Sequence, residues 1–154
     1  MKKYSFAKFM LIIVILFIPL YSMASALNIT KDLNNFYEEI INIQNQLNGL
    51  SQSLYISDQK GESLTPLQGS LSAYDAKIKN LNSKIFDYTT NSDISSINRI
   101  RLETLIVAIQ LLNDLNLILN ELLINEDYEL EYNLFKSFFS IDALLTQSLS
   151  AFPI

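Results

Sequence analysis

The chain has 154 residues, 49% of them hydrophobic, with 11 basic and 16 acidic residues and a net charge of −5. It contains no cysteine and no histidine, which excludes disulfides, thiolate or imidazole metal sites, and catalysis by a histidine base or a cysteine nucleophile. The acidic balance also disfavours binding to nucleic acid or anionic lipid.

Residues 1–26 have the pattern of a cleaved signal peptide. A lysine-rich start precedes the apolar run 9–20 and the small-residue cleavage site Ala-Ser-Ala at 24–26. The apolar run is shorter than the roughly 20 residues that span a bilayer, although an uncleaved anchor is the alternative interpretation. We therefore predict a secreted or periplasmic mature chain, a single domain over residues 27–154. It keeps 8 basic and all 16 acidic residues, for a net charge of −8.

Two segments of the mature chain carry apolar residues at alternating spacings of three and four. The first runs from residue 33 to 54 and the second from 64 to 88. This spacing predicts two helices, over residues 30–56 and 65–90, each with one narrow apolar seam.

Polar and glycine residues mark the ends of these two helices. Thr30 is expected to cap the first. Gly61 permits the tight reversal between them. Thr65, Pro66 and Gln68 have the spacing of a capping box at the start of the second helix, with Thr65 as its cap.

A third helix is predicted over residues 93–124, with Ser92 or Asp93 as its cap. Apolar residues cover most of its circumference, so it should contact several other helices. Arg101 and Thr104 lie where one of its apolar stripes would extend toward the start of the helix, and Asn116 interrupts the other stripe. We expect such residues to set the register of the bundle or to be exposed near a helix end, the alternative being a small wet pocket.

A fourth helix is predicted over residues 126–150, with Asn125 ending the third helix and capping the fourth. Four helices of similar length with short connections favour an all-α, antiparallel up-down-up-down four-helix bundle. Since no glycine or proline separates the last two, one continuous helix over 93–150, packed on a helical hairpin, is the alternative.

The fourth helix carries a second apolar row beside its seam, with two acidic residues near the start of that row. Such a row either fills the core or forms a surface that is buried only when a partner binds. We take it as the candidate partner surface, and its acidic flank would attract a basic partner. The surface consists of Tyr128, Tyr132, Phe135, Phe139, Glu129 and Glu131.

No motif in the chain predicts a catalytic, cofactor-binding or metal-binding residue. We therefore expect an exported, non-enzymatic protein that acts through protein–protein interaction, with an unidentified protein partner and with self-association as one form of that interaction. We expect it to bind no nucleic acid and to keep no stable membrane span after cleavage. The alternative function is a membrane-active or pore-forming protein whose apolar third helix opens out of the bundle.

Overall fold

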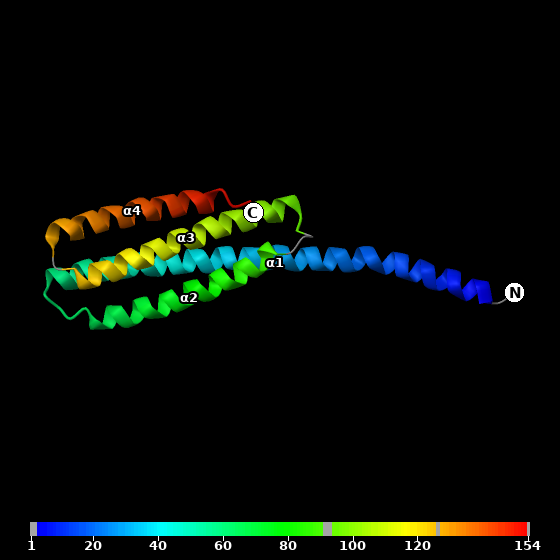
Figure 1. Ribbon diagram of the computed structural model, residues 1–154, viewed down its shortest axis with the longest axis horizontal. Coiled ribbons are helices and arrows are strands. Elements are labelled where there is room, and N and C mark those ends of the chain that lie inside the picture. The colour runs from blue at the N-terminus through cyan, green and yellow to red at the C-terminus, as the bar shows by residue number, and fades with distance from the viewer. Residues whose placement is uncertain (1–2, 91–93, 126, 154) are drawn as a thin grey trace.

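The computed structural model describes residues 3–90, 94–125 and 127–153, with side chains from residue 28 onward. Its four helices are α1 (Lys3–Gln59), α2 (Thr65–Thr89), α3 (Ser96–Ile124) and α4 (Tyr128–Ser150). Helices α1 and α3 run in one direction, and α2 and α4 run in the other (Figure 1). The predicted all-α four-helix bundle is confirmed. The alternative of one continuous C-terminal helix is wrong, because α3 and α4 are separate helices.

Helix α1 is longer than the bundle. Its N-terminal part projects beyond the other helices (Figure 1). Among the residues from 28 onward, whose side chains the structure describes, the first in the core is Ile29. Since α1 runs unbroken through Thr30, the prediction that Thr30 caps the first helix is wrong. The Thr30 hydroxyl instead lies 3.1 Å from the Asn98 Nδ2 atom of α3, which donates to it.

The start of α2 also differs from the predicted capping box. The residue before the helix is Leu64, whose backbone is already helical and which has no side chain that could cap. Thr65 is therefore inside the helix, and its own N–H group points to the Ser63 hydroxyl at 3.4 Å. Pro66 does lie in the first turn, and Gly61 adopts the positive φ of 65° that a tight turn requires.

Helix α3 begins later than predicted. Its cap is Ser95, which has an extended backbone and a hydroxyl that accepts from the Asn98 N–H group. The predicted caps, Ser92 and Asp93, lie outside the described residues.

The junction between α3 and α4 is made by two capping residues. Asn125 ends α3 as predicted. The prediction that it also caps α4 is wrong, because Asp127 Oδ1 accepts from the N–H groups of Glu129 at 2.9 Å and Leu130 at 3.3 Å. Asn125 instead holds the junction by accepting from the Asp127 N–H group at 3.2 Å.

Helix α3 forms the centre of the bundle and packs against each of the other three helices. This explains why apolar residues cover so much of its surface. Helices α1 and α4 approach each other less closely and are joined by side chains. The Gln44 amide of α1 donates to the Asp142 carboxylate of α4 at 2.6 Å and to the Thr146 hydroxyl at 3.0 Å. The seam between these two helices is therefore partly polar.

Candidate functional site

The aromatic row of α4 lies at the border between the core and the solvent. Its neighbours in the seam, Leu134 and Phe138, are buried. Tyr128, Tyr132 and Phe139 are 82%, 66% and 58% exposed, whereas Phe135 is half-buried and packs against the core. Core filling therefore accounts for one residue of the row, and the other three face solvent.

The last turns of α1 extend this row. The Tyr55 ring contacts the Phe135 ring edge to face, with centroids 5.9 Å apart and an interplanar angle of 86°. Tyr55 is itself 53% exposed. We use the term aromatic surface for Tyr55, Tyr128, Tyr132, Phe135 and Phe139. It lies toward the end of the bundle where α1 ends and α4 begins, opposite to the end from which the N-terminal part of α1 projects (Figure 1).

Carboxylates flank the aromatic surface. Glu129 is exposed and Glu131 is half-buried in the first turn of α4, and Asp58 is exposed in the last turn of α1. Burial, and secondly the negative charge of Asp58, raise the pKa of Glu131 above its usual value. Asp58 and Glu131 each lie one helical turn from the contact between the Tyr55 and Phe135 rings, at the same end of the antiparallel helices α1 and α4.

Two polar residues of α3 that the sequence analysis noted, Arg101 and Asn116, are buried in the bundle. Arg101 is buried, and its Nε donates to the Pro153 carbonyl at 2.7 Å, while its Nη1 donates to Asn98 Oδ1 at 3.1 Å. The guanidinium also lies 5.8 Å from the centroid of the Phe152 ring. Arg101 thus holds the C-terminal segment against α3. Asn116 is 2% exposed, and its Oδ1 has no hydrogen-bond partner among the described residues.

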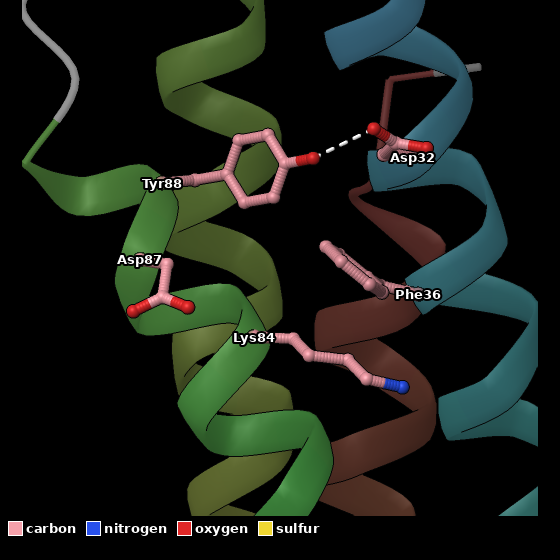
Figure 2. Close-up of a pocket in the computed structure, with 5 residues that line it drawn as sticks. All are labelled: Asp32, Phe36, Lys84, Asp87 and Tyr88. Atoms are coloured by element: carbon pink, nitrogen blue, oxygen red, sulfur yellow. Dashed lines mark hydrogen bonds between the residues drawn. The ribbon is translucent and has the colours of Figure 1, made fainter.

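A shallow groove of about 520 Å³ lies between α1 and α2 (Figure 2). The Tyr88 hydroxyl donates to Asp32 Oδ2 at 2.6 Å, and the Tyr88 ring meets the Phe36 ring edge to face at 5.7 Å. Burial and this hydrogen bond raise the pKa of Tyr88 to about 12. A hydroxyl that holds its proton so firmly is poorly suited to proton transfer near neutral pH.

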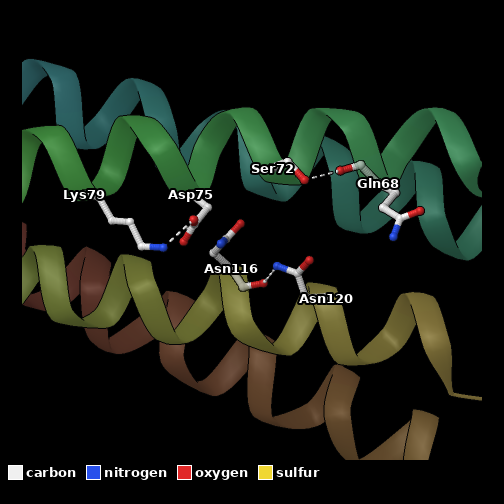
Figure 3. Close-up of polar contacts among 6 residues, drawn as sticks. All are labelled: Gln68, Ser72, Asp75, Lys79, Asn116 and Asn120. Atoms are coloured by element: carbon white, nitrogen blue, oxygen red, sulfur yellow. Dashed lines mark hydrogen bonds and ion pairs between the residues drawn. The ribbon is translucent and has the colours of Figure 1, made fainter.

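Polar side chains also follow the border between α2 and α3 (Figure 3). Lys79 forms an ion pair with Asp75 at 2.7 Å, and Asn120 Nδ2 donates to the Asn116 carbonyl at 2.8 Å. These contacts join residues within one helix. Over the described parts of the chain, no cluster of three or more acidic side chains could hold a metal ion.

Comparison of the chain with protein-family models, curated proteins and solved structures finds no match. Other large hydrophobic side chains are exposed as well, Ile124 and Phe86 among them. The aromatic surface differs from these in that its exposed rings follow one another along α4 and meet Tyr55 of α1.

Proposed function

We propose that this chain is an exported, non-enzymatic helical-bundle protein that binds another protein through its aromatic surface. The observation that carries the proposal is the exposure of Tyr128, Tyr132 and Phe139, each more than half accessible to solvent. Single exposed hydrophobic residues are common on soluble proteins, but neighbouring ones mark interaction sites. A row of three large rings beside Tyr55 is such a group.

The residue types in this surface suit a protein partner. Tyrosine combines a large contact area with a polar hydroxyl, so it tolerates water in the free protein and contributes strongly to binding when buried. Glu129 and Glu131 beside the rings would raise the association rate of a basic partner. Export rests on residues 1–26, and the assignment as a non-enzyme rests on the missing histidine and cysteine.

The double substitution Tyr132→Ser with Phe139→Ser tests the surface. Because both side chains are more than half exposed, the melting temperature should change little. Complexes trapped by cross-linking in the native extracellular or periplasmic fraction should disappear, and any self-association should weaken. The matched control is Phe86→Ser, which removes a ring 63% exposed on α2, and it should leave these complexes intact.

Two results would contradict the proposal. Unfolding of the double variant would place the rings in the core. Complexes that persist in the folded double variant would show that the protein binds through another face.

A membrane-active protein is the second candidate. Among the described residues, one helix, Ser96–Ile124, is long and apolar enough to cross a membrane, and 44% of its apolar window is buried in the bundle. Helix α3 would have to leave three neighbouring helices before it could insert. Release of a trapped dye from lipid vesicles by the purified mature chain would favour this alternative, whereas our proposal expects no release.

A further inference from the structure

We propose that the occupant of the aromatic surface is a basic segment of the partner, with a lysine or arginine side chain bound between Asp58 and Glu131 and against a tyrosine ring. This inference rests on the proposed function and adds the chemistry of the partner.

Asp58 lies where a negative charge is unfavourable for the free protein. It is in the last turn of α1, where the helix dipole is negative, and that turn contains no basic residue. Glu131 lies across from it, because Asp58 and Glu131 are each one helical turn beyond the contact between the Tyr55 and Phe135 rings on the antiparallel helices α1 and α4. The negative charge of Asp58 adds to burial in raising the pKa of Glu131. The ion pairs among the described residues, Lys60 with Glu62 and Lys79 with Asp75, include neither carboxylate. A cation between Asp58 and Glu131 would relieve this repulsion.

The tyrosine rings offer a second contact for the same cation. Lys136 Nζ lies 5.7 Å from the centroid of the Tyr132 ring, so this ring already attracts a cation from its own helix, and Tyr55 is the tyrosine ring that we assign to the cation of the partner. The edge-to-face contact with Phe135 leaves Tyr55 about half exposed. Because carboxylates and ring faces both attract cations, a lysine or arginine fits this surface better than a purely apolar side chain does.

The charge of the surrounding helix ends favours the same occupant. Residues 58–62 and 127–131 carry five carboxylates and one lysine, and that lysine, Lys60, is already 3.9 Å from Glu62. A second copy of the mature chain, with a net charge of −8, would be repelled on approach. Charge complementarity therefore selects a basic partner over self-association.

The test is titration of the mature chain with a short arginine–glycine repeat peptide at low salt, followed by calorimetry and by amide chemical shifts. Shifts should concentrate at the ends of α1 and α4. The variant Asp58→Asn with Glu131→Gln should bind about fivefold to tenfold more weakly. The matched control, Glu38→Gln with Glu39→Gln, removes the same amount of negative charge at positions on α1 about 30 Å from Asp58. It should change the affinity for the peptide by less than about twofold.

Equal weakening by both variants would overturn the inference, because it would show diffuse attraction to an acidic protein. Absence of binding by the arginine peptide would overturn it as well. If the peptide fails to bind while Tyr132→Ser with Phe139→Ser still removes the native complexes, the proposed function stands and only the basic partner is wrong. If the double serine variant keeps its complexes, the proposed function itself fails.

Discussion

Replacement of the buried Asn116 by leucine should stabilise the bundle. Asn116 points from α3 toward α2 (Figure 3) and is 2% exposed. Its Oδ1 has no partner among the residues that the structure describes, and its neighbours along the same stripe of α3, Leu112 and Leu119, are fully buried. Leucine would therefore replace an unpaired polar group in an apolar row.

The size of the effect follows from two favourable terms and one opposing term. An unpaired buried polar atom costs about 1–3 kcal/mol, and burial of a leucine side chain adds about 1.5–3 kcal/mol. Fitting a bulkier branched side chain into a packed core costs about 1–3 kcal/mol. We expect a net gain of about 1–3 kcal/mol in the free energy of unfolding, which corresponds to a rise of roughly 4–12 °C in melting temperature.

Urea unfolding followed by circular dichroism measures this change, with Asn116→Ala as the control. Alanine also removes the unpaired oxygen but leaves a cavity, so it should stabilise less than leucine does. Sedimentation of the leucine variant tests whether Asn116 sets the register, since a new oligomer would reveal that role. A leucine variant that is less stable than the wild type, with an unchanged m-value, would refute the reasoning.

Two further predictions concern the α1–α2 contact and export. Because the folded protein raises the pKa of Tyr88 from 10.0 to about 12, its contribution to stability is fully present below pH 10 and is lost as the pH rises through 12. The fall in unfolding free energy over this window should be smaller in Tyr88→Phe, and an equal fall would contradict the raised pKa of Tyr88 that burial and the hydrogen bond to Asp32 produce. N-terminal sequencing of the exported chain should begin at Leu27, and recovery of intact Met1 from membranes would disprove cleavage.

The sequence predicted the seams of the bundle well because alternating spacings of three and four fix one face of a helix. Leu33, Ile40 and Leu47 all have no exposed surface. The helix ends were predicted less well. Several residues near each end can cap equally well, so Ser95 rather than Ser92 or Asp93 starts α3, and Asp127 rather than Asn125 starts α4.

The candidate surface could be predicted only in part. A second row on an amphipathic helix has the same spacing whether it is buried or exposed, so the sequence could not separate these two cases for Tyr132 and Phe139. Helices α1 and α4 do not pack closely against each other in the folded bundle, so Tyr132 and Phe139 stay exposed. Tyr55 and Asp58 were missed because their nearness to α4 depends on how helices pair in space. For Tyr55, the only local sign of a place at the edge of the core was that it follows Leu54, the last residue of the first apolar seam.

The contact between Arg101 and Pro153 affects the order in which the bundle can close. The two residues are 52 positions apart, and before Pro153 docks, a buried Arg101 guanidinium would lack the carbonyl that compensates for its loss of water. The end of the bundle near Thr30 and Asn98 should therefore assemble only after residue 153 has been synthesised. A chain that closes this end of the bundle last stays unfolded there for longer during synthesis, which would suit the export that we propose.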